Sequence, residues 1–529
     1  MYDEACRAIA GRLAAAAGDT LSPSEVRRLV RDTAAQYRLS TVPANQDIIR
    51  HLGPDSLRYR KLLMVKPAKT ASGVAVIAVM PKPYECPHGR CIYCPGGIEF
   101  NTPLSYTGTE PATRAAQKFN FDPFHQVSSK LEQLQARGHD TGKSEIVVVG
   151  GTFPFMPAGY QRDFAKSCYD ALNGFRSATL AEAMAANESS AANRCVGFTV
   201  ETKPDYCKEP HVDLMLELGV TRVELGVQSL RDDVYRLVNR GHNIADVKDA
   251  FRIARDSGYK IVAHMMPGLP GSSPEKDVED FERLFADESF RPDMLKVYPT
   301  LVLENTGLHR LHQSGRYFAY SDGDLVDLLV HMKKVVPPYV RIMRVQREIE
   351  SADIVAGPKS GNLRQLVLAK LKERGLKCRC IRCREAGLQK RHPAADDVEL
   401  KRIDYTASGG QEVFLSFESK EDGNETILGF LRLRRVASPH RGELVNAAIV
   451  RELHVYGQAI GVGSAADAGS LQHRGYGMKL MQEAERIARE EMEGVSKLAV
   501  ISAVGTREYY KKQLVGYRQD GPYVSKVLS

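Results

Sequence analysis

Apolar and polar positions along this chain follow different patterns, and each pattern predicts a different kind of structure. Up to about residue 75 the spacing is helical, whereas from about 76 to 370 short runs rich in valine and isoleucine alternate with longer amphipathic stretches. The runs predicted to be buried strands are 74–80, 145–151, 195–201, 222–229, 259–266 and 293–300. Repeated strand–helix units predict a parallel sheet, open or closed into a barrel, with its chemistry at the carboxyl ends of the strands.

The pattern changes again beyond residue 370, where a short, strongly basic and cysteine-dense stretch begins. After it we predict antiparallel strands at 412–419 and 427–436, a strand at 447–457, an amphipathic helix at 478–492 and a strand at 498–505. This order is typical of a separate α+β domain. The predicted parts are a basic helical segment over 1–75, a βα domain over 76–370, a cysteine-rich linker over 371–395 and the α+β domain over 396–529.

The chain has 529 residues, of which 43% are hydrophobic and 26% charged, and its net charge is +8. Such a length exceeds one hydrophobic core, and the composition is typical of a soluble globular protein. The basic residues of 1–75 suggest a surface for an anionic partner, although a solvated helical face would have the same composition. With no apolar stretch of membrane-spanning length and no signal peptide, we expect a cytoplasmic protein without a membrane partner.

Three cysteines, Cys86, Cys91 and Cys94, lie within nine residues just after the first predicted strand. Neighbouring prolines and glycines keep this segment a loop, so the three sulphurs can converge. Clustered cysteines in a chain without a secretion signal favour metal ligation over disulfides. Three thiolates can hold three irons of a [4Fe–4S] cluster and leave the fourth iron open for S-adenosylmethionine. The alternative is a zinc ion that takes His88 as its fourth ligand.

Polar residues and glycines follow several of the predicted strands. Gly150, Gly151 and Thr152 end the second strand, where glycine lets the backbone approach a ligand and exposed carbonyls can receive the ammonium group of S-adenosylmethionine. The other strand-end residues are Glu201, Lys203, Glu224, Gln228, His264 and Lys296. Because such positions meet at one edge of a βα fold, we expect Glu201, Gln228 and His264 to bind cofactor and Lys296 to act in catalysis. Ordinary solvation is the alternative for any single one.

The second cysteine cluster, Cys378, Cys380 and Cys383, lies in the basic linker rather than at a strand end. Its tight spacing predicts one structural metal, most plausibly zinc, that pins the two flanking domains together. A fourth ligand is needed, and His392 is the nearest histidine. A second iron–sulphur cluster and no metal at all are the alternatives.

Two glycines precede the predicted helix at 478–492 in the spacing Q-x-x-G-x-G. Unpaired backbone N–H groups at a helix N-terminus suit a pyrophosphate, and the flanking strands complete the order of a GNAT acetyltransferase fold that binds acetyl-CoA. The candidate cofactor-binding residues here are Gln472, His473, Arg474, Gly475, Tyr476 and Gly477. Tyr509 or Tyr510 could protonate the departing coenzyme A thiolate, and aromatic packing is the alternative for at least one of them.

These motifs together closely resemble one family, the catalytic subunit of Elongator, which is a tRNA wobble-uridine acetyltransferase. The resemblance runs from about residue 40 to the end, and the four residues between Cys86 and Cys91 fit this family. The motifs include CPHGRCIYCPGG, SYTGTEP, GGTF, ETKPDYC, LGVQS, NRGH, AHMMPGLPG, RVQREI, RELHVYG, QHRGYGMKLM and AVISAVGTREYY.

The resemblance implies a partial TIM-type barrel joined to a GNAT domain. In such enzymes the cluster reduces S-adenosylmethionine to a deoxyadenosyl radical, which is thought to take hydrogen from the methyl group of acetyl-CoA. The resulting carbon radical adds to C5 of the wobble uridine in a tRNA anticodon stem-loop, and thioester cleavage leaves a carboxymethyl group. This reasoning explains why one chain would need both sites, because C5 is not nucleophilic enough for ordinary acyl transfer.

The chain departs from the family pattern in places. Lys203 stands where many members have arginine, and all three cysteines of the second cluster are kept, which favours a real metal. We expect a stand-alone enzyme, with a homodimer or Elongator-type partners as further possibilities. Two other functions stay open, a protein-lysine acetyltransferase with a purely structural iron–sulphur half and a non-catalytic tRNA-binding scaffold.

Overall fold

A seven-stranded parallel sheet forms the centre of the molecule. The structure is a computed structural model that describes residues 1–16, 21–53, 57–389, 391, 393, 395–421, 423–456 and 475–528. Neighbouring strands in this sheet follow the order β1-β2-β3-β4-β5-β6-β8. Their bounds are β1 Ala75–Val79, β2 Lys143–Val148, β3 Arg194–Thr202, β4 Arg222–Gln228, β5 Lys260–Met265, β6 Met294–Val297 and β8 Arg341–Arg344. Since the order has two free edges, the sheet is an open half-barrel.

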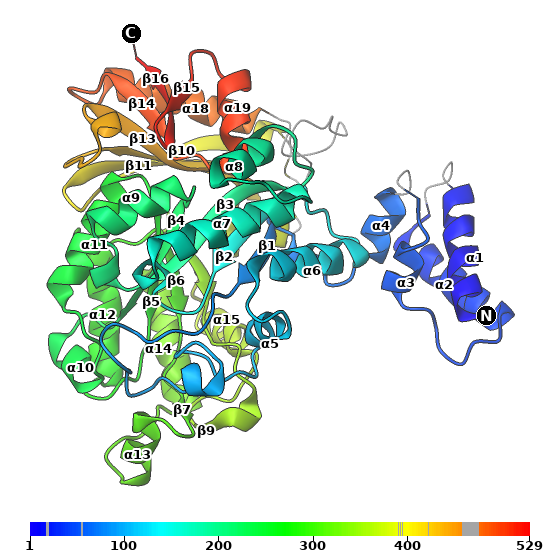
Figure 1. Cartoon of the computed structure of the whole chain (residues 1–529), viewed down its shortest axis with the longest axis horizontal. Coiled ribbons are helices and arrows are strands. Elements are labelled where there is room, and N and C mark those ends of the chain that lie inside the picture. The colour runs from blue at the N-terminus through cyan, green and yellow to red at the C-terminus, as the bar shows by residue number, and fades with distance from the viewer. Residues whose placement is uncertain are drawn as a thin grey trace.

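Helices connect successive strands of the half-barrel and cover its outer face (Figure 1). They bury apolar stripes against the sheet, as α11 does with Val247, Ala250, Phe251 and Ala254. Their bounds are α5 Pro111–Lys118, α6 Pro123–Ala136, α7 Ala158–Asn173, α8 Leu180–Ser189, α9 Glu209–Glu217, α10 Asp232–Leu237, α11 Ile244–Asp256, α12 Pro274–Ala286, α13 Gly307–Gln313, α14 Asp322–Val335 and α15 Leu363–Glu373. A separate two-stranded antiparallel sheet pairs β7 (Val302–Leu303) with β9 (Ile354–Ala356).

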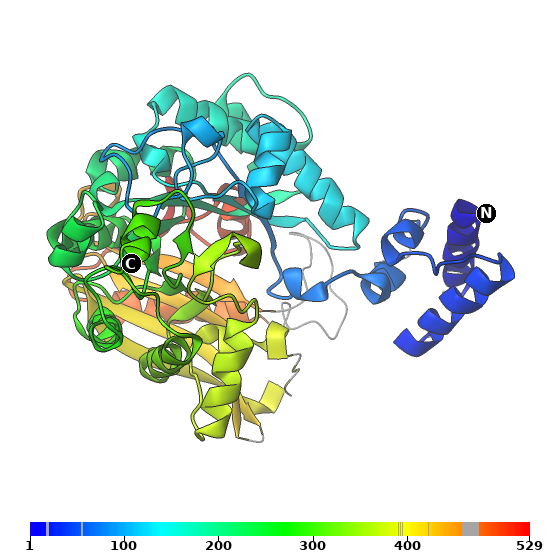
Figure 2. The same ribbon diagram turned by 90° about the horizontal axis from the view of Figure 1, so that it is seen from below.

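The N-terminal helices form a unit with a core of its own. They are α1 Tyr2–Ala15, α2 Pro23–Gln36, α3 Asn45–Ile49 and α4 Leu57–Leu63. Ile9, Val26, Ile48 and Leu63 belong to this separate core, and both views show the helices standing apart from the main body (Figures 1 and 2). Arg27, Arg28 and Arg31 are exposed on α2.

A second, mixed sheet forms the C-terminal domain, with the order β10-β11-β12-β13-β14-β16-β15. β13 and β14 pair in parallel, whereas the other pairs are antiparallel. The bounds are β10 Val398–Ala407, β11 Gly410–Glu421, β12 Asn424–Arg435, β13 Ala447–Val455, β14 Lys497–Val500, β15 Arg518–Asp520 and β16 Tyr523–Val527, with helices α16 Ile381–Arg384, α17 Ala386–Gln389, α18 Tyr476–Glu490 and α19 Arg507–Gln513.

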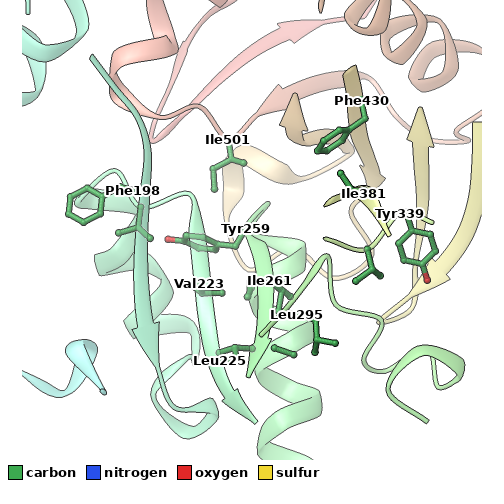
Figure 3. Close-up of a cluster of buried hydrophobic side chains, with 14 of the residues drawn as sticks. Phe198, Val223, Leu225, Tyr259, Ile261, Leu295, Tyr339, Ile381, Phe430 and Ile501 are labelled. Atoms are coloured by element: carbon green, nitrogen blue, oxygen red, sulfur yellow. The ribbon is translucent and has the colours of Figure 1, made fainter. Parts of the chain in front are cut away.

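The two sheets share one hydrophobic core. Val223 of β4 and Ile261 of β5 belong to the same buried cluster as Phe430 of β12 and Ile501, which follows β14 (Figure 3). Gly505 lies so close to the backbone of Cys195, at the start of β3, that an added Cβ would be 2.7 Å from the Cys195 nitrogen. The C-terminal domain therefore packs on the amino ends of the half-barrel strands.

Buried ion pairs complete this contact. Asp293, just before β6, accepts two 2.7 Å hydrogen bonds from Arg451 of β13 and lies 3.5 Å from Arg432 of β12. Asp256, at the end of α11, accepts bonds of 2.6 and 2.9 Å from Arg434. All three arginines are fully buried. A charge in this position is stable only while its partner is present.

The predicted fold class is confirmed: a parallel half-barrel is joined to a C-terminal domain built on a sheet. All six predicted strands of the half-barrel are present, and 177–194 contains a helix, α8. The short, arginine-flanked β8 was not predicted, nor was β10, an edge strand with many exposed charged side chains. Among the described residues, no helix combines the length and the apolar character that crossing a bilayer requires.

The buried ion pairs lead to a stability prediction. Asp293→Asn leaves Arg451 and Arg432 without their shared counter-ion, so we expect the free energy of unfolding to fall by about 3–5 kcal/mol in urea titrations. Asp327→Asn, which breaks an exposed pair with Arg374, is the matched control and should cost less than about 1 kcal/mol. Equal losses of unfolding free energy in the two variants would contradict the assignment of Asp293 as a buried counter-ion.

The pH dependence of this effect has a defined sign. Burial alone would raise the pKa of Asp293, but Arg451 and Arg432 hold it well below its ordinary value. The stabilisation is therefore complete above the unfolded aspartate pKa of about 3.9 and is lost as the pH falls further. The difference in the free energy of unfolding between the wild type and Asp293→Asn should therefore decrease in acid.

Candidate active site

A cavity of about 200 Å³ opens at the carboxyl ends of the half-barrel strands, and most of the site residues predicted in the half-barrel meet in it. It is lined by the predicted residues Cys86, Cys91, Cys94, Gly150, Gly151, Thr152, Glu201, Gln228 and His264. These side chains come from the loop after β1 and from the ends of β2, β3, β4 and β5. Lys296, at β6, reaches the same group through Glu224.

The cysteine loop holds its thiols by local turns and by charge. The N–H of Gly89 donates to the carbonyl of Cys86, and that of Cys94 donates to the carbonyl of Cys91, both at 3.0 Å. Cys91 Sγ lies 3.2 Å from His88 Nε2 and 3.8 Å from Arg240 Nη1. A hydrogen bond from Cys94, together with these two neighbours, lowers the pKa of Cys91 well below its ordinary value. The loop therefore stabilises a thiolate, the form that binds iron.

The spacing of the sulphur atoms differs between the two cysteine clusters. Zinc binds its ligands at about 2.0–2.3 Å, which keeps their donor atoms within roughly 4 Å of one another. Over the described part of the chain, Cys378, Cys380 and Cys383 have sulphurs that all lie within 4.8 Å of each other, whereas the triplet at 86, 91 and 94 is not in such a group. The wider spread suits a four-iron cluster better than one zinc ion, although His88 is close enough to join either.

The ends of β2 and β4 form a cradle that includes a buried polar atom without a hydrogen-bond partner. Gly150 and Gly151 have φ angles of +126° and +112°, and their N–H groups donate to Glu201 Oε2 at 2.9 and 3.4 Å. Gln228 has a φ of +74°, an uncommon conformation for a residue with a side chain. Its Oε1 is buried without a hydrogen-bond partner. A strained residue with an unsatisfied acceptor fits a ligand that donates hydrogen bonds, as S-adenosylmethionine would.

A buried trio of charges lies deeper in the cavity. Glu224 Oε2 accepts a 2.8 Å hydrogen bond from His264 Nε2 and an ion-pair contact from Lys296. Although burial opposes it, Lys296, His264 and their neighbours hold the pKa of Glu224 far below its ordinary value. The carboxylate is therefore ionised and fixes both partners.

Lys203, the departure from the family pattern, lies at the other side of the cysteine loop. Its Nζ donates to His88 Nδ1 and to Asp205, both at 3.1 Å. A lysine here makes single contacts to the imidazole and the carboxylate, and it still supplies a positive charge near the cysteines.

Several cavity residues carried no sequence signal strong enough to select them. These are Arg240, Tyr298, Arg344 and Arg347. Arg240 lies in the NRGH motif, and Arg344 and Arg347 lie in the RVQREI motif, but neither motif indicated a role for these residues. Arg344 belongs to β8, the strand that the hydrophobic pattern did not predict.

The second cysteine cluster lies between the two domains. Lys333 of α14 extends its ammonium group to Cys378 Sγ at 3.6 Å and to Cys383 Sγ at 3.9 Å. Arg384 donates to Glu418 of β11 and to the carbonyl of Pro338, which ties the cysteine turn to both sheets. The sulphur spacing fits one zinc ion. His392 lies outside the described residues.

The predicted acetyl-CoA site begins at α18. Gly475 is the N-cap of this helix with a φ of +74°, and Tyr476 and Gly477 are its first residues. An added Cβ on Gly477 would be 3.3 Å from the Tyr509 hydroxyl, so this tyrosine lies against the helix N-terminus. Tyr510 is instead buried in the core. The remaining predicted residues, Gln472, His473 and Arg474, lie outside the described part of the chain.

Comparison with known proteins agrees with this arrangement. Residues 2–71 match the model of the ELP3 N-terminal domain, 81–284 that of the radical SAM superfamily and 292–373 that of the radical SAM C-terminal domain. The radical SAM match supports a [4Fe–4S] cluster and S-adenosylmethionine as cofactors.

Relatives cover almost the whole chain. Human Elongator complex protein 3 is 47% identical over 95% of this chain and 93% of its own length. The tRNA uridine(34) acetyltransferase of Methanocaldococcus infernus is 43% identical, with 97% and 96% covered. A solved structure of archaeal M. infernus Elp3 with an N-terminal deletion matches with a TM-score of 0.76 at 41% identity, covering 86% of this chain and 100% of that one.

The cavity leads to a prediction about iron. Cys91→Ala removes the thiolate that His88 and Arg240 stabilise, so anaerobic reconstitution should leave the variant with little iron or acid-labile sulphide. Cys168→Ala is the matched control, because that free thiol is also buried but lies on α7 outside both clusters. It should bind as much iron as the wild type. Full iron in Cys91→Ala, or a wild type that binds zinc but no iron, would contradict the assignment.

Proposed function

This chain belongs to the family of Elongator complex protein 3 and the tRNA uridine(34) acetyltransferases, and we propose that it attaches a carboxymethyl group to C5 of the tRNA wobble uridine. The acetyl group of acetyl-CoA would supply the carbon. The observation that carries the proposal is the meeting of Cys86, Cys91 and Cys94 with the ends of β2 to β6 in one cavity. An open iron and a polar cradle beside it are what radical cleavage of S-adenosylmethionine needs.

The residues of the cavity would have separate roles in the reaction. Cys86, Cys91 and Cys94 would hold the cluster, which when bound supplies the electron for radical chemistry. Glu201 and Gln228 would orient S-adenosylmethionine, because one fixes the glycine turn and the other offers an unpaired acceptor.

The N-terminal helices would bind the tRNA backbone. Arg27, Arg28 and Arg31 are exposed together on α2, and exposed Lys66 and Lys69 continue the positive charge toward the half-barrel. Such contacts position a nucleic acid without reading its sequence, while an unpaired anticodon base can be splayed into a protein cavity.

The C-terminal domain would hold acetyl-CoA. The N-terminus of α18 offers unpaired N–H groups to a pyrophosphate, and the Tyr509 hydroxyl lies beside it. The second cluster would bind zinc as a structural link between the domains, with Cys378, Cys380 and Cys383 as ligands.

One reaction tests the proposal. The reconstituted protein is incubated without oxygen with S-adenosylmethionine, acetyl-CoA, a reductant and tRNA, and nucleosides are analysed by mass spectrometry. We expect a carboxymethylated uridine that depends on every component. Acetyl-CoA breakdown that proceeds equally well without tRNA would overturn the proposal.

The same experiment distinguishes the other functions. A protein-lysine acetyltransferase would acetylate lysine peptides in Cys86→Ala as well as in the wild type and would ignore S-adenosylmethionine. A non-catalytic scaffold would bind tRNA but form no 5′-deoxyadenosine.

The two tyrosines lead to a further prediction. Burial raises the pKa of Tyr509, so its hydroxyl stays protonated at neutral pH and can donate to a departing thiolate. Tyr509→Phe should slow thioester cleavage by about 10²–10⁴-fold, the usual effect of losing a general acid. Tyr510→Phe should change the rate little, because Tyr510 packs in the core. The release of free coenzyme A measures both, and a larger loss in Tyr510→Phe would reverse the assignment.

A further inference from the structure

A histidine held by a carboxylate faces the cavity and has no role in binding a cluster. The Nε2 atom of His264 donates to Glu224 at 2.8 Å, and Glu224 must be ionised because Lys296 contacts the same oxygen. In the neutral imidazole, this contact places the proton on Nε2. Nδ1 then carries the lone pair, and over the described residues it has no hydrogen-bond partner. The ring of Tyr298 packs edge-on against the imidazole, with centroids 5.2 Å apart, and limits its rotation.

The proposed reaction requires a base. When a carbon radical adds to C5 of uracil, a C–C bond forms and the unpaired electron moves to C6. Restoring the C5=C6 double bond requires that C6 lose one electron to an oxidised iron–sulphur centre and that the C5–H bond release its proton. The electron pair of that bond becomes the new π bond. A proton acceptor must therefore lie at the substrate.

We propose that His264 is this general base, with Glu224 and Lys296 as positioning residues. The inference rests on the proposed function and goes beyond it. A histidine oriented by a buried carboxylate is the arrangement that activates bases in many enzymes. The sequence pattern predicts cofactor binding by His264 and catalysis by Lys296, whereas this proposal gives catalysis to His264 and positioning to Lys296.

The other basic groups of the cavity each make hydrogen bonds that hold them in other roles. His88 uses both ring nitrogens, one on Cys91 and one on Lys203. Glu201 holds the two glycine N–H groups with one oxygen. The carboxylate of Glu110 accepts hydrogen bonds from the backbone of Thr107 and Gly108 and from Thr113.

The remaining titratable groups are poor bases or lie at the rim. Although burial opposes it, Glu224 raises the pKa of Lys296, which therefore stays protonated. Burial raises the pKa of Tyr298, so its hydroxyl also stays protonated. Glu348 is largely exposed and pairs with Arg344 at 3.3 Å. His264 thus stands out among the described groups as the acceptor.

A bound cation is the competing interpretation of the same residues. Glu201, Glu224 and His264 have ligand atoms within 4.8 Å of one another, a spacing that a divalent metal could use. The ammonium of Lys296 already contacts Glu224 Oε2, which leaves Glu224 Oε1 as the oxygen without a partner. The lysine supplies the positive charge that a metal would otherwise bring.

The test uses the full chain with His264→Gln, which can keep a donor toward Glu224 but cannot accept the proton. We expect the yield of modified uridine to fall by about 10²–10⁴-fold, while 5′-deoxyadenosine formation and tRNA affinity stay near wild type. Transfer RNA carrying deuterium at C5 of the uridine should slow residual product formation in the variant more than in the wild type, because proton removal has become limiting. His331→Gln is the matched control, since His331 also pairs with a glutamate at 2.8 Å but on the helical surface. It should behave as the wild type.

Each outcome bears on the proposal. Parallel loss of 5′-deoxyadenosine and product without a deuterium effect would indicate a structural or cofactor-binding role and would overturn it. If His264→Gln fails to fold, Glu224→Gln supplies the same readout, because it keeps the shape of the pair and removes its charge. Binding of a divalent cation by the wild type that is lost in both His264→Gln and Glu224→Gln would favour the cation instead. A wild type that forms no modified uridine refutes the proposed function itself, which is a different result from a normal yield in His264→Gln.

Discussion

The architecture depends on one carboxylate, Asp293, at the amino end of β6. It accepts two hydrogen bonds from Arg451 and attracts Arg432, so two strands of the second sheet are fixed to the base of the first. Removing two arginines and an aspartate from water is costly, and only close pairing offsets it. The contact is therefore specific: few other surfaces could satisfy these charges. The contact covers the amino ends of the half-barrel strands and leaves their carboxyl ends free for chemistry.

The cavity also contains a buried carboxylate that cations keep ionised, but this carboxylate has a different role. Glu224 is as deeply buried as Asp293 and is likewise held ionised by cations. At the base, the charges are closed off by a second domain. In the cavity, one partner of the carboxylate is a histidine whose other nitrogen remains available. The sequence alone could not separate these cases, because each is an acidic residue beside a buried strand.

Much of the fold follows from local pattern. Runs such as 145–151 and 259–266 are apolar on both faces, which is typical of strands covered on both sides. The hydrophobic pattern did not predict β8, because its charged residues meet partners that are distant in sequence, as Arg341 does with Glu385 and Tyr456. It did not predict β10, because this edge strand has exposed charged side chains. For the site, strand ends and cysteine spacing found the residues that line the cavity. They could not reveal Arg240 beside Cys91 or the bond between His264 and Glu224, since both depend on how loops and strands meet in space.

The relative position of the two predicted sites constrains the proposed function. Gly505, just before α19, contacts the start of β3 at Cys195, whereas Glu201 near the end of that strand lines the cavity. From Cys195 to Glu201 a strand rises roughly 20 Å. The Tyr509 region and the cavity are thus separated along the strand axis. The buried ion pairs hold the C-terminal domain in place against the half-barrel. Coenzyme A carries its acetyl group on a long flexible arm. If one acetyl-CoA molecule serves both sites, its nucleotide end at α18 would be the fixed part and its thioester end the part that moves.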